Sequence, residues 1–157
     1  MQIADLLSPE GVAAALKVQG KKQLLQELSA RAAGLVRVPE RRIYETLTER
    51  ERLGTTGVGQ GIAIPHGRLI DIEKIVGVFA RLETPIEYEA VDNQPVDLVF
   101  MLLAPEGAGA DHLKALARVS RLLRNQIACE KLRAASNAEA LYAILTEPAG
   151  SASSVAA

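Results

Sequence analysis

The sequence predicts one α/β domain, a mixed β-sheet flanked by α-helices on both faces. Three observations predict it: helical periodicity at both ends of the chain, short apolar runs in the middle, and no internal repeat. The 157 residues suffice for one domain with a sizeable core and are too few for two full-sized ones. We expect the domain to cover residues 1–147 and the small-residue tail at 148–157 to be flexible.

The amino-terminal segment allows two interpretations. The Ser-Pro pair at 8–9 is typical of a helix start, whereas the apolar run at 12–18 favours a short strand, which is our prediction. From 21 to 35, leucines and alanines recur at spacings of three and four, which predicts a helix. Pro39 opens a second helix, and Gly54 is expected as its left-handed cap.

The middle of the chain is expected to form the sheet. Residues 54–61 are rich in glycine and predict a loop rather than a strand or helix. Short apolar strands are expected at 62–64, 74–82 and 96–103. The last is almost continuously apolar and therefore central in the sheet. The polar residues at 92–95 predict a turn between the last two strands.

The carboxy-terminal third is expected to be helical. A long helix begins near Asp111, and the segments 126–135 and 137–145 form one or two more helices. The long helix carries basic side chains on the face away from its leucines, for which a solvated face is favoured over a docking stripe for an acidic partner. These side chains are Lys114, Arg118, Arg121 and Arg124.

Composition excludes several classes of function. The formal net charge of −1 gives no basic field for nucleic acid. No apolar run approaches the roughly 20 residues that span a bilayer, and the first residues lack the pattern of a signal peptide, so neither membrane insertion nor secretion is expected. The single cysteine, Cys129, cannot form an internal disulfide, which fits the cytoplasm.

The glycines at 57, 59 and 61 invite a nucleotide-binding interpretation that their spacing contradicts. The dinucleotide fingerprint needs its third glycine where Ile62 stands, and no P-loop motif occurs. Two interpretations remain for Gly57, Gly59 and Gly61: a phosphate loop whose backbone amides approach an anion, or a flexible connector.

His66 is the first candidate for a reactive side chain. It lies between Pro65 and Gly67 at the end of an apolar strand, where small neighbours leave its ring accessible. A histidine with a pKa of about 6.5 is largely neutral at cellular pH, so one ring nitrogen has a lone pair for nucleophilic attack. The alternative is a turn histidine that bonds only to nearby backbone.

His112 and Arg50 are the other candidates. His112 shares an apolar helix face with Leu116 and Val119, so it either packs in the core or projects into a cleft and meets His66. Arg50 follows the apolar stripe of its helix to the edge of the glycine segment. There it would pair with a phosphate or lie exposed among its charged neighbours. Two histidines and one distant cysteine do not resemble a zinc site, and no metal is expected.

Several segments, in order, resemble the IIA proteins of the fructose/mannitol/nitrogen class in the bacterial phosphotransferase system. The main one is LGTTGVGQGIAIPHGRL at 53–69, followed by LETPI at 82–86, DNQPVDL at 92–98 and DHL at 111–113. The match covers nearly the whole chain. A basic residue after His-Gly, and no appended transporter domain, resemble the nitrogen-regulatory branch most.

The resemblance implies a role for each candidate residue. His66 falls on the phosphorylated histidine of the family, His112 on the histidine that supports the phosphoryl group, and Arg50 on the arginine beside it. Gln60 stands where the family commonly has asparagine, which leaves the local geometry of the loop open. The family implies no metal, nucleotide or other cofactor. It implies a phosphorylated histidine phosphocarrier protein as the phosphoryl donor.

Three functions are compatible with these residues. The first is a phosphotransferase in the sense of a phosphohistidine carrier, whose phosphorylation state regulates protein partners. The second is a sugar-specific IIA component that passes the phosphoryl group to a transporter IIB subunit. The third, of another class, is a non-catalytic anion-binding regulatory domain. The sequence names neither the regulated partner nor the oligomeric state.

Overall fold

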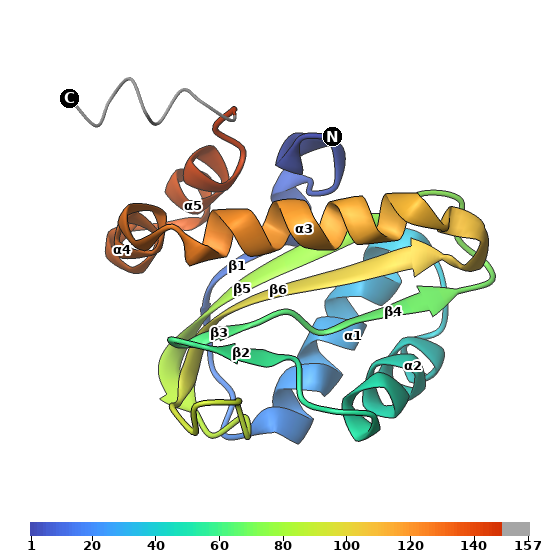
Figure 1. The fold of residues 1–157 in the computed structure, drawn as a ribbon, viewed down its shortest axis with the longest axis horizontal. Coiled ribbons are helices and arrows are strands. Elements are labelled where there is room, and N and C mark those ends of the chain that lie inside the picture. The colour runs from blue at the N-terminus through green and yellow to red at the C-terminus, as the bar shows by residue number, and fades with distance from the viewer. Residues whose placement is uncertain (149–157) are drawn as a thin grey trace.

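The computed structural model describes residues 1–148 and contains one mixed sheet packed between two layers of helices (Figure 1). Residues 149–157, most of the predicted tail, lie outside the described residues. The sheet contains β1 (Val12–Leu16), β2 (Gly57–Gly59), β3 (Ile62–Ala63), β4 (His66–Leu69), β5 (Val76–Ile86) and β6 (Val96–Pro105). The helices are α1 (Lys21–Val36), α2 (Glu40–Arg52), α3 (Ala110–Arg124), α4 (Gln126–Ala134) and α5 (Ala138–Leu145).

Strand β6 is central, as its continuous apolar run predicts. It pairs antiparallel with β5, which pairs parallel with β1. On its other side β6 pairs parallel with two strands in succession, first with β3 and then with β4. β2 forms a hairpin with β3 at that edge. The predicted mixed sheet is confirmed, and His66 is the first residue of β4, directly after the break between β3 and β4.

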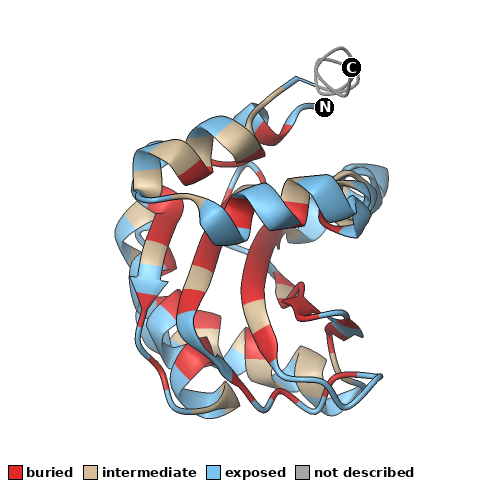
Figure 2. Ribbon diagram, turned by 90° about the vertical axis from the view of Figure 1, so that its left-hand side faces the viewer, coloured by how far each residue is buried: buried red, intermediate tan, exposed pale blue. Residues whose placement is uncertain are grey.

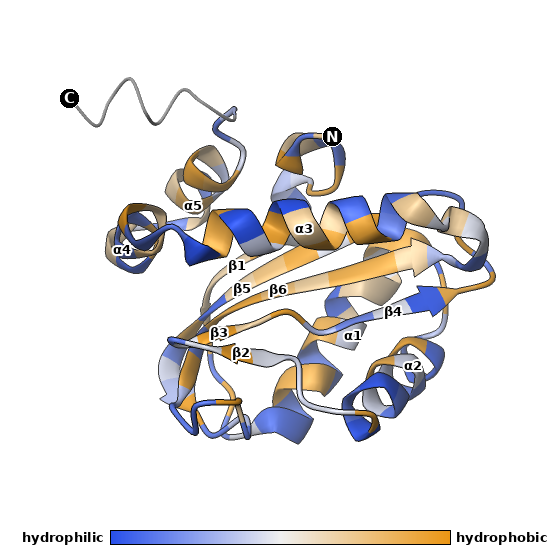
Figure 3. Ribbon diagram, viewed as in Figure 1, coloured by the Kyte–Doolittle hydropathy of each residue, from blue (hydrophilic) through white to orange (hydrophobic). Residues whose placement is uncertain are grey.

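The alternation of side chains along β6 divides the core into two halves. Val99, Met101 and Leu103 face one cluster that includes the buried residues of α1 and α2. Phe100 and Leu102 face the other, which includes the buried residues of α3, α4 and α5. Figure 2 shows the buried strands between the two helical layers, and Figure 3 shows that β6 is largely apolar. Helices therefore cover both faces, because both faces of the central strands are apolar.

The helix boundaries agree with the periodicity, with one difference at the end of α2. The expected left-handed cap at Gly54 is wrong: its φ is +151°, and the cap of α2 is Leu53 in a right-handed conformation. The left-handed cap occurs at the end of α1 instead, at Arg37 with φ +58°. At the amino terminus both interpretations hold in part, since a short 3-10 turn at Pro9–Gly11 leads directly into β1.

The glycine-rich segment is a hairpin and not the loop that the sequence predicts. Gly57 pairs with Ala63 and Gly59 with Ile62 across β2 and β3. The turn between them has positive φ at both central residues, +58° at Gln60 and +85° at Gly61. Two-residue hairpin turns of this kind require positive φ at both positions. A strand of three residues at a sheet edge tolerates glycines that a central strand would not.

Candidate functional site

His66 begins β4 at the point where the edge of the sheet changes partner strand. The Leu102 amide of β6 donates to the Pro65 carbonyl, and His66 lies in register with Leu102. Proline has no amide hydrogen, so the ladder can be interrupted here without leaving a donor unpaired. Gly67 follows, and a Cβ at that position would lie 2.5 Å from Cγ2 of Thr46 in α2. Glycine therefore lets α2 pack directly on the strand that carries His66.

The His66 ring is half-buried and has one nitrogen engaged. Its Nδ1 lies 2.8 Å from the Ile64 carbonyl oxygen. A carbonyl can only accept, so Nδ1 carries the proton and Nε2 keeps its lone pair. Burial lowers the pKa of His66, and the nearby charge of Arg50 lowers it further, against an opposing effect of the Ile64 hydrogen bond. The ring is therefore neutral at pH 7.

His112 lies in the first turn of α3 and meets His66. The two ring centroids are 5.7 Å apart with an interplanar angle of 73°. The His112 side chain is buried, with 5% of the residue exposed. Its Nδ1 accepts a hydrogen bond from Nε of Arg68 at 3.1 Å, and its buried Nε2 has no partner among the described residues. Burial lowers the pKa of His112, and the charge of His66 when that ring is protonated and the charge of Arg68 lower it further.

Arg50 lies in the last turn of α2, near His66. It is half-buried, its Nη1 donates to the Gly54 carbonyl at 2.9 Å, and its charge acts on His66. The neighbouring Glu51 has several partners. Its carboxylate forms an ion pair with Lys21 at 2.9 Å and accepts hydrogen bonds from Thr56 and Tyr88. Glu51 thus ties the end of α2 to three other segments, which holds Arg50 in place.

The three glycines predicted as a phosphate loop have neighbours of their own. A Cβ on Gly57 would meet Ala90 at 2.8 Å, and its amide already donates to Thr55 Oγ1 at 3.1 Å. A Cβ on Gly59 would approach Asp92, and one on Gly61 would lie 2.6 Å from Nη2 of Arg133. Close packing explains Gly57, and the positive φ of Gly59 and Gly61, +105° and +85°, favours glycine there. The role of the three glycines as amide donors to a phosphoryl group stays a prediction.

Comparison with known protein families identifies the family of the chain. Residues 5–147 match the family model described as the phosphoenolpyruvate-dependent sugar phosphotransferase system, EIIA 2. The chain belongs to this EIIA 2 family. The resemblance that the motif at 53–69 predicts is therefore confirmed.

Relatives place the chain near the nitrogen-regulatory members of the EIIA 2 family. It is 60% identical over 152 residues to a nitrogen regulatory protein of Bradyrhizobium diazoefficiens, covering 97% of this chain and 99% of the relative. The crystal structure of the nitrogen regulatory protein IIA-Ntr from Neisseria meningitidis superposes with a TM-score of 0.87 at 35% identity. That match covers 92% of this chain and 99% of the other. A fructose-specific EIIABC component of Bacillus subtilis is 32% identical over 94% of this chain and 23% of the relative.

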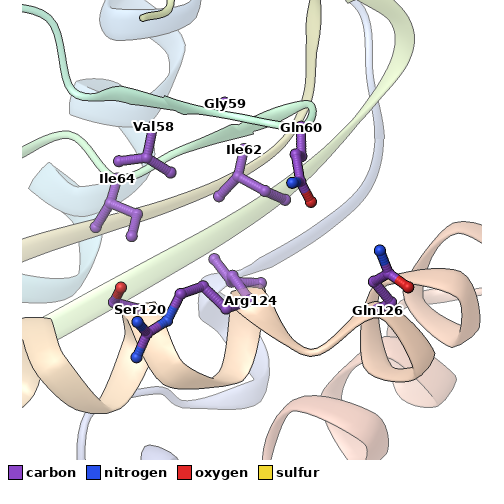
Figure 4. Close-up of a pocket in the computed structure, with 9 residues that line it drawn as sticks. Val58, Gly59, Gln60, Ile62, Ile64, Ser120, Arg124 and Gln126 are labelled. Carbon is purple, nitrogen blue, oxygen red and sulfur yellow. The ribbon is translucent and has the colours of Figure 1, made fainter. Parts of the chain in front are cut away.

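A groove lies between the hairpin and the carboxy-terminal half of α3. It measures about 400 Å³ (Figure 4). Val58, Ile62 and Ile64 form one wall, and Ser120 and Arg124 of α3 form the other. Ile64 also supplies the carbonyl that holds His66, so the groove adjoins the site without containing either ring.

Two side chains join this set only in the structure. Arg68, which the sequence marks only as the basic residue after His-Gly, donates to Nδ1 of His112, and Glu51 ties the end of α2, next to Arg50, to Lys21 and Tyr88. Arg68 and His66 lie two residues apart on β4, a strand that the sequence did not predict, so no local pattern placed them on one face. Glu51 gave no signal, because Lys21 and Tyr88 lie far from it along the chain.

Residues 1–148 contain no cluster of three or more histidine, cysteine or acidic side chains able to hold a metal ion. Over the same residues, no helix is long and apolar enough to cross a membrane.

Proposed function

We propose that the protein is a phosphohistidine carrier in which Nε2 of His66 accepts a phosphoryl group from a phosphorylated histidine phosphocarrier protein. The observation that supports this most is the hydrogen bond between Nδ1 and the Ile64 carbonyl at 2.8 Å. It occupies one ring nitrogen and leaves the other as the nucleophile, on a neutral ring. Membership of the EIIA 2 family supports the same chemistry.

The transfer needs no cofactor. The Nε2 lone pair attacks the phosphorus of the donor's phosphohistidine in line, the new N–P bond forms, and the donor's N–P bond breaks with its electron pair returning to the donor nitrogen. His66 keeps its Nδ1 proton throughout. The transferred group is close to metaphosphate at the transition state, so the site acts by positioning it and by stabilising charge on its oxygens.

Two side chains beside His66 supply that stabilisation. The buried Nε2 of His112 is a hydrogen-bond donor with no partner among residues 1–148, which is costly unless a ligand satisfies it. A phosphoryl oxygen on the neighbouring ring would satisfy it. The Arg50 guanidinium retains donors beyond the one used on Gly54, and it adds a full positive charge. His112 and Arg50 therefore support the group without accepting it.

Labelling with a phosphorylated histidine phosphocarrier tests the proposal. The wild-type protein should gain one acid-labile, base-stable phosphoryl group, seen as a mass increase of about 80 Da. His66→Gln should gain none while keeping the wild-type circular dichroism spectrum. Labelling of His66→Gln at the wild-type level would refute the assignment. No labelling of the wild type would favour a non-catalytic anion-binding domain instead.

The phosphorylated form, we infer, regulates protein partners. A phosphoryl group adds nearly two negative charges at the molecular surface and can create or remove a docking site. The name nitrogen regulatory protein, carried by the 60% identical relative, supports this role.

A sugar-transport role is the second candidate. The likeness to a fructose-specific EIIABC component favours it. Incubation of the labelled protein with a purified fructose or mannitol IIB subunit separates the two roles. Rapid transfer to IIB would support the sugar-specific role, and stable label in its presence would support the regulatory one.

A further inference from the structure

Arg68 stands in an unusual relation to His112. It lies on β4, in register with Ala104 of β6, and its Nε donates to Nδ1 of His112 at 3.1 Å. Its Nη1 donates to the Glu106 carbonyl at 3.3 Å, in the segment that leads into α3. The guanidinium therefore bridges the end of a strand and the start of the helix that carries His112. Two contacts from one rigid plane define its orientation.

The contact determines where the single proton of the neutral His112 ring resides. An arginine N–H can only donate, so Nδ1 of His112 must accept with its lone pair. The proton of the neutral ring is then on Nε2, the buried nitrogen without a partner. With the opposite tautomer, Nδ1–H would face Arg68 donor to donor, and Nε2 would be an acceptor unable to bind a phosphoryl oxygen.

We propose that Arg68 is a positioning residue that holds His112 in its Nε2–H tautomer, so that the ring presents a hydrogen-bond donor to the phosphoryl group on His66. The tautomer belongs to the unphosphorylated protein. Only its use in phosphoryl transfer rests on the proposed function.

The two rings thus have complementary tautomers, each imposed by a neighbour. The Ile64 carbonyl accepts from His66 and leaves its Nε2 a nucleophile. The Arg68 guanidinium donates to His112 and leaves its Nε2 a donor. The rings lie 5.7 Å apart, so a group held by the first ring is offered a donor by the second. A positive charge beside Nδ1 also opposes protonation of His112, which keeps the ring neutral.

Long-range ¹H–¹⁵N correlation spectra of histidine-labelled, unphosphorylated protein test the proposal directly. The chain has two histidines, so His66→Gln assigns both signal sets. In the wild type, His112 should show the Nε2–H pattern. Arg68→Met, which has no donor, should shift His112 toward a mixture of tautomers. Lys114→Met removes an exposed cation from the same turn of α3 and should leave the His112 pattern unchanged.

A second readout connects the tautomer to transfer. Arg68→Met should slow phosphoryl transfer to His66 roughly tenfold, the scale on which outer-shell partners of a functional histidine act. In a His112→Ala background the same change should have little further effect, because Arg68 acts through His112. Arg68→Lys keeps the charge but loses the rigid fork, and should restore the rate only in part.

Several results would overturn the proposal. A wild-type His112 with its proton on Nδ1 would exclude the tautomer assignment, and an unchanged pattern in Arg68→Met would exclude Arg68 as its cause, whether or not labelling succeeds. Equal slowing by Arg68→Met with and without His112 would show that Arg68 acts elsewhere. If labelling fails while the Nε2–H pattern depends on Arg68, the proposed function fails and the tautomer assignment stands.

Discussion

The hairpin region and the amino-terminal end of α3 differ in how their polar groups are paired. Near the hairpin, Arg133 of α4 binds both carboxylate oxygens of Asp97 at 2.8 Å and the Gln60 carbonyl at 3.2 Å. The Asp92 carboxylate accepts from the amides of Gln60 and Gln94. At the amino-terminal end, His112 has a buried nitrogen without a partner among the described residues. Polar groups near the hairpin form hydrogen bonds with one another, whereas the buried Nε2 of His112 near His66 is available to a ligand.

This difference separates structural polar groups from functional ones. A bidentate arginine–carboxylate pair with additional carbonyl contacts is a complete arrangement and leaves nothing for a ligand. A buried donor without an acceptor destabilises the folded state, so its presence needs an explanation such as ligand binding. The glycines of the hairpin are the more conspicuous feature of the sequence, but the buried Nε2 of His112 lies at the amino-terminal end of α3.

The largest expected effect on phosphoryl transfer follows from removing the buried donor of His112. We expect His112→Ala to slow phosphoryl transfer to His66 by roughly 10²–10³-fold, as loss of one preorganised donor does, without abolishing labelling. Quenched-flow labelling with a phosphorylated histidine phosphocarrier measures the rate. Arg133→Gln, beside the hairpin, should label at the wild-type rate. Complete loss of labelling in His112→Ala would mean that its ring is the nucleophile or is needed for donor binding.

Gly61→Ala should lower the stability of the fold and leave the rate of phosphoryl transfer unchanged. The new Cβ would lie 2.6 Å from Nη2 of Arg133 at a backbone φ of +85°, so we expect a loss of about 2 kcal/mol in the free energy of unfolding. Urea unfolding measures it, and the rate of labelling should not change, because the strain falls on the hairpin. A normal stability with slow labelling would instead support the interpretation of the glycines as amide donors to phosphate.

The pH dependence of stability should show two separate windows. The pKa values of His66 and His112 are lowered in the folded state, so the unfolded chain binds more protons below pH 6.5. Their contribution is therefore complete above the ordinary pKa of 6.5 and is lost as pH falls through the folded values. Asp92, whose pKa is lowered by hydrogen bonds from the Gln60 and Gln94 amides, loses its contribution only below 3.8.

Urea titrations between pH 8 and pH 3 measure both windows. Replacing both histidines by glutamine should flatten the upper window alone, and Asp92→Asn should affect the lower one alone. An upper window that persists without either histidine would show that burial of these rings is not its cause.

The smallest expected effect concerns the hairpin turn. Gln60 has a φ of +58°, a left-handed conformation that asparagine adopts more readily than glutamine. Gln60→Asn should therefore raise the free energy of unfolding by less than about 1 kcal/mol, with labelling unchanged. A thermal midpoint at or below that of the wild type would contradict this reading of the turn.

Much of the fold could be predicted because its signals are local. The leucine spacing of α1 and the continuous apolar run of β6 both appear within one segment of sequence. The hairpin at 57–63 could not be predicted, because its glycines are typical of a loop. It becomes part of the sheet only because β3 pairs with β6 and β2 pairs with β3. His66, His112 and Arg50 were candidates from residue type and resemblance. Their approach to one another is a tertiary fact.

The sequence by itself determined the helices, the central strands, the two-faced core and the residue types able to carry a phosphoryl group, because each depends on neighbours a few positions apart. Only the tertiary structure decided the state of those residues. The proton on His112 is placed by an arginine 44 residues away, and the end of α2 that carries Arg50 is tied by Glu51 to the distant Lys21 and Tyr88. Hydrogen bonds act over about 3 Å in space, whatever the separation along the chain, so they exist only once the chain has folded.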